Sequence, residues 1–150
     1  MTAKVDYAVR AMAEMASASA ASPLKAETVA WRQDIPVRFL LNILASLRVA
    51  RLVDSRRGSD GGYWLARPSE KISVADVIRA VEGPLADVHG APPEDVTYPP
   101  STAGLRDVWL ATRAALRRVL ETVTIADVVA GDMPAEVTAE LTQPGALERR

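Results

Sequence analysis

Residues 36–65 read PVRFLLNILASLRVARLVDSRRGSDGGYWL, and this stretch decides the fold. Its first half carries apolar side chains at helical spacing, with basic and polar side chains mostly between them. Its second half is an extended run with Asp60-Gly61 at the tip, a strong hairpin signal before the β-prone residues that follow. The stretch therefore predicts a helix over Pro36–Val49 that leads into a hairpin over Leu52–Leu65. A helix followed by an arginine–glycine hairpin is typical of a winged helix, whose helix enters the major groove while the tip reaches phosphates or the minor groove.

Two shorter helices are expected before this stretch. Residues 4–17 carry one apolar face, and residues 25–33 form a short helix that ends at the turn Asp34-Ile35-Pro36. Proline suits the start of the helix that follows. Two helices joined by a tight turn, with the basic residues on the second, predict a helix-turn-helix. A generic helical hairpin is the alternative.

The candidate DNA contacts lie on both helices and on the wing. Side chains at the start of the second helix are placed for phosphates, because a helix N-terminus attracts anions. Side chains on the third helix face the groove, and those of the wing tip reach phosphates or the minor groove; a solvated surface charge is the alternative for each arginine. The residues predicted to contact DNA are Lys25, Thr28, Val37, Arg38, Asn42, Arg48, Ser55, Arg56, Arg57 and Gly58.

The charge distribution supports this placement, although the whole chain has a net charge of −1. Residues 1–83 carry 12 Lys and Arg against 9 Asp and Glu, a net +3. Residues 84–150 carry 6 against 10, a net −4. Positive charge is thus concentrated where the helix and hairpin are predicted.

Composition excludes several classes of function. The chain has no cysteine and one histidine, His89, so thiolate metal sites, disulfides and cysteine nucleophiles are excluded and histidine-dependent catalysis has little support. No nucleophile is paired with a base, and we expect no enzyme activity, no metal and no cofactor. No apolar run approaches the length of a membrane span. The alanine-rich stretch Ala11–Ala21 is not expected to be a signal peptide, because charged residues lie within it and next to it. We therefore expect a soluble, cytoplasmic protein.

The second half of the chain begins with a capped helix. Ser73 and Asp76 form a capping box for a helix that Gly83-Pro84 ends. Residues 87–102 hold four prolines without periodicity and predict a loop. Thr124 to Asp127 is a second capping box, which opens a short helix ending at Gly131.

A long helix is predicted from Ala103 to about Thr122. An apolar stripe runs along it and needs a cover; a second copy packed antiparallel is one solution, and folding back onto the same domain is the other. The residues predicted for dimerisation are Leu105, Val108, Trp109, Thr112, Leu116, Val119, Leu120 and Val123. Trp109 packs in this interface or forms the wall of an effector pocket, while Trp64 packs beneath the wing or is exposed for stacking.

The fold class expected is mainly α with a small β-hairpin wing, a winged helix-turn-helix domain plus a long dimerisation helix. The predicted organisation is a DNA-binding domain over 1–84, a proline-rich loop over 85–102, the dimerisation helix and a short following helix over 103–131, and a disordered tail over 132–150.

The chain resembles the IscR/NsrR/CymR-type family of bacterial winged-helix transcription regulators. The matching segments are YAVRAM (7–12), FLLNILASLRVARLVDSRRGSDGGYWLAR (39–67), ISVADVIRAVEG (72–83) and the region from Trp109 through TIADVV (124–129). The resemblance implies a homodimer formed through the long helix, bound to double-stranded DNA at imperfect palindromes.

Two departures from the family pattern matter. The family usually has an acidic residue after a Tyr-Leu pair early in the recognition helix, whereas Leu41 follows Phe39-Leu40 here. Many members also hold an iron–sulfur cluster on three loop cysteines, which this loop lacks. The resemblance therefore implies a cluster-free regulator that responds to a partner protein or a small molecule, or that lacks a known signal. A protein-interaction module, or a sensor using oxygen and nitrogen ligands such as Asp6 and His89, remains an alternative.

Overall fold

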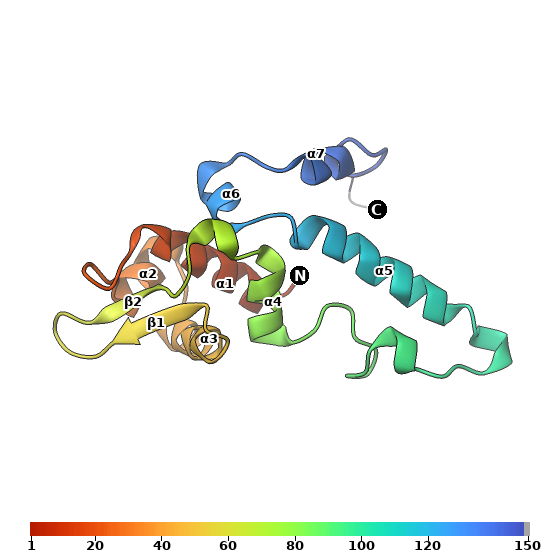
Figure 1. The fold of residues 1–150 in the computed structure, drawn as a ribbon, viewed down its shortest axis with the longest axis horizontal. Coiled ribbons are helices and arrows are strands. Elements are labelled where there is room, and N and C mark those ends of the chain that lie inside the picture. Colours follow the sequence, from red (N-terminus) through yellow and green to blue (C-terminus); the bar gives the residue numbers. More distant parts are fainter. Residues whose placement is uncertain (149–150) are drawn as a thin grey trace.

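The computed structural model describes residues 1–148, and in that range it contains seven α-helices and one antiparallel hairpin (Figure 1). The elements in chain order are α1 (Ala3–Glu14), α2 (Ala26–Gln33), α3 (Val37–Val49), β1 (Val53–Arg56), β2 (Gly62–Leu65), α4 (Val74–Glu82), α5 (Leu105–Leu120), α6 (Ile125–Ala130) and α7 (Ala135–Leu141). The mainly helical class with a hairpin wing is therefore confirmed. Within residues 1–148, no helix is both long and apolar enough to cross a bilayer.

The helices α1 to α4 and the hairpin surround one hydrophobic core, and this part is called the head below. The core is aliphatic, with alanine and methionine, and none of the buried side chains in residues 1–148 is aromatic. The inner side chains of α1 and of the 3-10 turn that follows it are at most 4% exposed: Val5, Ala8, Ala11 and Met12 in the helix and Met15 in the turn. An alanine-rich α1 allows its neighbours to approach closely, which explains how so few aromatic residues suffice.

The helix α6 also packs against the head, although the sequence grouped it with the long helix. Both predicted capping boxes form, with Ser73 accepting from the Asp76 amide and Thr124 accepting from the Asp127 amide, each at 3.1 Å. The two caps lie side by side: the Val74 amide donates to the Val123 carbonyl at 2.8 Å. Ile125, the first residue of α6, is fully buried in the head core. The chain thus returns to the head after α5.

The helix α5 and the preceding loop form an arm that leaves the head (Figure 1). The loop contains two single 3-10 turns, Pro93–Asp95 and Pro100–Thr102, and runs beside α5. Glu94 of the loop pairs with Arg113 of α5 at 2.7 Å. No residue of α5 is buried, so this helix lacks a complete cover within the described part of the chain.

The structure describes a short helix in residues 132–148, where the sequence predicts a disordered tail. This helix is α7, which spans Ala135–Leu141. Pro134 immediately precedes the helix and can start it without losing a needed N–H, and the residues that follow include good helix formers. Glu140 of α7 also pairs with Arg118 of α5 at 2.6 Å, a contact that no local signal predicts. Residues 149 and 150 of the predicted tail lie outside the described residues.

Candidate nucleic-acid interface

The turn between α2 and α3 has the form that a helix-turn-helix requires. Asp34 ends α2 in the left-handed region at φ 51°, and the Ile35 amide donates to the Ala30 carbonyl at 2.9 Å. Ile35 is 4% exposed, so the turn is fixed to the core by an apolar side chain. Pro36 then leads into α3 one residue before its first helical position, which is a shift of one residue from the predicted start.

The helix α3 has a buried inner face and an exposed outer face. Its inner side chains are at most 1% exposed: Leu40, Ile43, Leu44 and Leu47. Phe39, assigned to the apolar face from sequence, is 40% exposed and packs edge-on against Tyr7 with ring centroids 5.7 Å apart. The outer face presents Arg38 and Asn42 to solvent, as predicted. A helix held this firmly can offer those side chains to a groove without rearranging.

The wing is a two-stranded antiparallel hairpin with Val53 opposite Leu65 and Arg56 opposite Gly62. Tyr63 also exchanges two backbone hydrogen bonds with Leu24, at 2.7 and 3.0 Å, so the segment before α2 adds a bridge to the wing. Close approach of this segment explains Gly62: a Cβ there would lie 2.5 Å from the Leu24 carbonyl oxygen. The wing is therefore fixed to the start of the helix-turn-helix.

Two of the residues predicted to contact DNA also form hydrogen bonds at the wing tip. The Lys25 Nζ donates to the Gly58 carbonyl at 2.9 Å, and the Arg56 guanidinium donates to the Asp60 carbonyl at 3.0 Å. Arg57 is exposed and forms no side-chain hydrogen bond or ion pair with other residues of the described range 1–148. Arg57 is thus the tip cation that is available to a ligand, while Lys25 and Arg56 shape the loop that carries it.

A groove of about 350 Å³ lies between α3, the start of α2 and the wing, and is called the basic groove below. Six predicted DNA contacts line it: Lys25, Arg48, Ser55, Arg56, Arg57 and Gly58. Its lining includes four basic side chains and one acidic side chain, Glu27. Val37, Arg38 and Asn42 lie on the exposed surface of α3 outside its lining, and Thr28 is half-buried on α2.

Leu41 also lines the basic groove, although it is not among the DNA contacts predicted from the sequence. Its position on the helix carried a usable signal, because Leu41 lies three residues after Arg38 and seven before Arg48, on the outer side of α3. Trp64, by comparison, is half-buried and lines a separate hollow beside Ala16 and Pro68, close to the packing role predicted for it.

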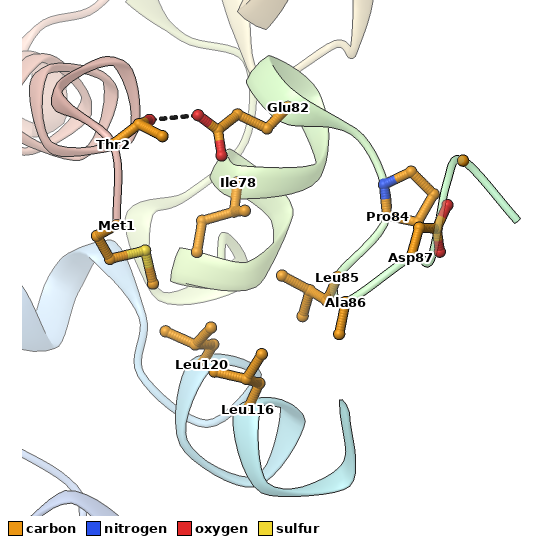
Figure 2. Close-up of a pocket in the computed structure, with 11 residues that line it drawn as sticks. Met1, Thr2, Ile78, Glu82, Pro84, Leu85, Ala86, Asp87, Leu116 and Leu120 are labelled. Carbon is orange, nitrogen blue, oxygen red and sulfur yellow. Dashed lines mark hydrogen bonds between the residues drawn. The ribbon is translucent and has the colours of Figure 1, made fainter. Parts of the chain in front are cut away.

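A second cavity, of about 600 Å³, lies where α5 meets the head. Leu116 and Leu120 point from α5 toward Ile78 and Leu85 across it, as Figure 2 shows. Glu82 stands at its edge and accepts a hydrogen bond from the Thr2 hydroxyl. Two residues predicted for dimerisation therefore face their own head.

The other residues predicted for dimerisation also differ in how far their own chain covers them. Val123 is 6% exposed and buried against its own chain, so it has little surface to offer a second copy. Trp109 and Val119 are half-buried, whereas Leu105 and Val108 are 38% and 51% exposed and Thr112 is exposed. Within residues 1–148, the head therefore covers one edge of the apolar stripe of α5 and leaves the other edge exposed.

Comparison with known families gives a match over most of the chain. The Rrf2 family model, described as an iron-dependent transcriptional regulator, matches residues 1–131. The family and the regulators described below are transcriptional regulators and not enzymes, which confirms the assignment of a non-enzymatic function.

The iron in that family description does not fit the donor groups of this chain. Iron–sulfur clusters are held by cysteine thiolates, and the sequence has none. Asp6 is exposed and paired with Arg10 at 3.3 Å, while His89 is exposed in the loop. No three His, Asp or Glu side chains gather into a possible metal site anywhere in residues 1–148.

Relatives and solved structures agree with the family model. Rv1287 of Mycobacterium tuberculosis, an HTH-type transcriptional regulator by name, is 49% identical over 137 residues, which cover 91% of this chain and 85% of that protein. CymR of Bacillus subtilis is 29% identical over 85% of this chain and 87% of its own. The structure of B. subtilis CymR, a global cysteine regulator, matches with a TM-score of 0.72 at 27% identity over 87% of this chain and 96% of that one. The structure of T. potens IscR matches with a TM-score of 0.70 at 29% identity over 95% and 92% of the two chains. With its winged helix-turn-helix and basic groove, the chain belongs to the Rrf2 family of DNA-binding transcriptional regulators.

Proposed function

We propose that two copies of the chain pair through α5 and that their heads read the two halves of a palindromic DNA site without an iron–sulfur cluster. The observation that carries the proposal is that α5 bears an apolar stripe yet has no buried residue. A contiguous exposed apolar strip on a helix favours association, because burial removes apolar surface from water. Twofold pairing would place the two recognition helices one DNA turn apart, about 34 Å, or a multiple of it.

The uncovered edge of α5 has the spacing of a helix–helix seam. The residues of this exposed seam follow one another at intervals of three and four, and all are exposed except Val119, which is half-buried: Leu105, Val108, Thr112, Ala115 and Val119. That interval is typical of helices packed along a shallow crossing angle. The arginines lie off the seam, where Arg113 pairs with Glu94 and Arg118 with Glu140. A second copy could therefore cover the seam without burying an unpaired charge.

The head supports DNA reading through its charge and its rigidity. The basic groove combines Arg48 of α3 with Arg57 of the wing tip, so that one surface can follow a phosphate backbone while α3 faces the bases. Two heads would double these contacts, which raises the affinity for a site with matching symmetry.

A cluster-free regulator would need another signal. The absence of cysteine removes the thiolate ligands of a cluster. A small molecule or a partner protein would act by changing the angle between the head and α5, because rotation at an interface is a common switch. Solution scattering can measure the arrangement of the two heads. The same arrangement with and without effector and DNA would contradict this step.

Dimerisation is tested by replacing Val108 with glutamate, which places a charge within the exposed seam. We expect Val108→Glu to sediment as a monomer at concentrations where the native chain is a dimer, since two desolvated carboxylates would have no partner. Val129→Glu is the matched control, because Val129 is 57% exposed but lies on α6. A native chain that is monomeric at every concentration would contradict the proposal.

DNA reading is tested by selecting bound duplexes from a random pool and then titrating salt. A palindrome should emerge with the native chain. Loss of one phosphate contact per subunit in Arg57→Ala should make the slope of log affinity against log salt less negative by about 1.8 for the dimer. Arg67→Ala is the control, because Arg67 is exposed outside the basic groove and should leave the slope unchanged.

A protein-docking winged helix is the competing function, and the 82% exposure of Trp31 on α2 favours it. A docking module would show no duplex affinity even at low salt. The remaining alternative, a sensor with oxygen and nitrogen ligands, would require stoichiometric metal in protein purified without added metal.

A further inference from the structure

Leu41 is an apolar side chain exposed in a basic setting. It is 41% exposed and lines the basic groove together with Lys25, Arg48 and Arg57. Neighbouring leucines of α3 such as Leu40 and Leu44 are at most 1% exposed, so the core does not need Leu41 to turn inward. Its exposed surface is therefore open to whatever occupies the groove.

The position of Leu41 on α3 is suited to base edges and not to the DNA backbone. It lies in the opening half of the helix, and residues near the start of a recognition helix contact base edges in a helix-turn-helix. Arg48 lies two turns further along the same side of α3, toward the wing. Arginines on either side of the groove can bind phosphates, whereas a leucine has no donor or acceptor for them.

The chemistry of the major groove offers this side chain one apolar partner. Each base edge presents donors and acceptors there, and thymine alone adds a methyl group at C5. The geometry points to Leu41 as a specificity-determining residue that contacts a thymine methyl in each half-site, which makes an A·T pair at that position preferred. This inference rests on the proposed function, because it names the base that the proposed DNA contact selects.

The experiment removes only the methyl group. In a duplex selected by the native chain, thymine is replaced by deoxyuracil at one symmetry-related pair of positions at a time, and Kd is measured at fixed salt. Burial of one methyl is worth about a fourfold change in affinity, so removal from both half-sites should raise Kd about fifteenfold at the position that Leu41 reads.

Variants assign the effect to Leu41. In Leu41→Ala, the same deoxyuracil duplex should bind within about twofold of the thymine duplex, since the partner of the methyl is gone. Val49→Ala is the matched control: Val49 is 86% exposed on α3 but lies outside the basic groove, so this variant should keep the full methyl effect. Unchanged circular dichroism and thermal midpoint exclude unfolding as the cause. In Leu41→Glu, a repeated selection should place cytosine at that position, because its amino group donates to a carboxylate.

The possible outcomes distinguish this inference from the proposed function on which it rests. A selected palindrome whose binding is insensitive to every thymine methyl, or a methyl effect that persists in Leu41→Ala, overturns the inference and leaves the proposed function standing. Failure of the native chain to select any duplex overturns both.

Discussion

Replacing Gly62 with alanine tests how the wing is fixed to the head. Gly62 has φ +151°, a conformation that residues with side chains rarely adopt, and an added Cβ would lie 2.5 Å from the Leu24 carbonyl oxygen and 2.7 Å from its carbon. Both atoms are backbone, so a side-chain rotation cannot relieve the overlap. The Leu24 segment must move away from Tyr63.

The expected loss of stability follows from the contacts that this movement breaks. Leu24 and Tyr63 would lose two backbone hydrogen bonds, now 2.7 and 3.0 Å long, at a net cost of about 0.5–1.5 kcal/mol each. Forcing alanine into this backbone region adds about 1–3 kcal/mol. We therefore expect Gly62→Ala to reduce the free energy of unfolding by about 2–6 kcal/mol. The Lys25 bond to the wing tip should weaken with it, because Lys25 follows Leu24 directly.

Urea denaturation followed by circular dichroism measures this loss, with all variants at the same protein concentration because dimerisation would shift the apparent stability. Gly104→Ala is the control: nothing lies within 4 Å of its added Cβ, and its φ of −64° suits alanine. We expect the control to change stability by less than about 1 kcal/mol. A Gly62→Ala protein that matches the native midpoint would refute the placement of Leu24 against the wing.

Two further predictions concern helix contacts in the head. The hydrogen bond that Arg32 donates to Glu14, at 2.7 Å, lowers the pKa of the Glu14 carboxyl below its usual 4.5, and Gln33 contributes further. The ionised Glu14 therefore stabilises the fold above pH 4.5, and this stabilisation is lost as the pH falls through the lowered pKa. Glu14→Gln should flatten the dependence of unfolding free energy on pH between about pH 6 and 3, and an unchanged slope would contradict the assignment. Ser73→Ala removes the side-chain acceptor of the capping box and should cost about 0.5–2 kcal/mol in thermal or urea unfolding, whereas Ser59→Ala, at the exposed wing tip, should cost less than about 0.5 kcal/mol.

Local signals in the sequence were sufficient for the elements of the head. The apolar spacing of α3, the Asp60-Gly61 tip and the two capping boxes each involve residues within a few positions of one another. Each gave the predicted element, although Phe39 of α3 is 40% exposed. The exposed outer face of α3 followed from the same periodicity, which is why Arg38 was placed correctly on the surface.

Contacts between distant residues account for what the sequence did not predict. Lys25 reaches Gly58, 33 positions away, so its role in holding the wing tip depends on the fold. The return of α6 to the head depends on the pairing of Ser73 with Thr124, which belong to separate local motifs. Hydrophobic periodicity likewise gave Leu116 and Val108 the same role, although only one of them faces the head.

Because the chain returns to the head directly after α5, one end of this helix is anchored to the head. Val123 and Ile125 are buried directly after α5, and Glu121 pairs with Arg79 of α4, so the C-terminal end of the helix is held by the head. Its 16 residues place Leu105 about 24 Å from this end. A rotation of about 10° at the held end would therefore move Leu105 by about 4 Å. If two copies pair antiparallel along the seam, such a rotation changes the separation of the two heads, because the far end of each helix lies against the held end of the other. We therefore expect half-site spacing to depend on side chains at the junction of α5 and the head, such as Leu120, which do not contact DNA.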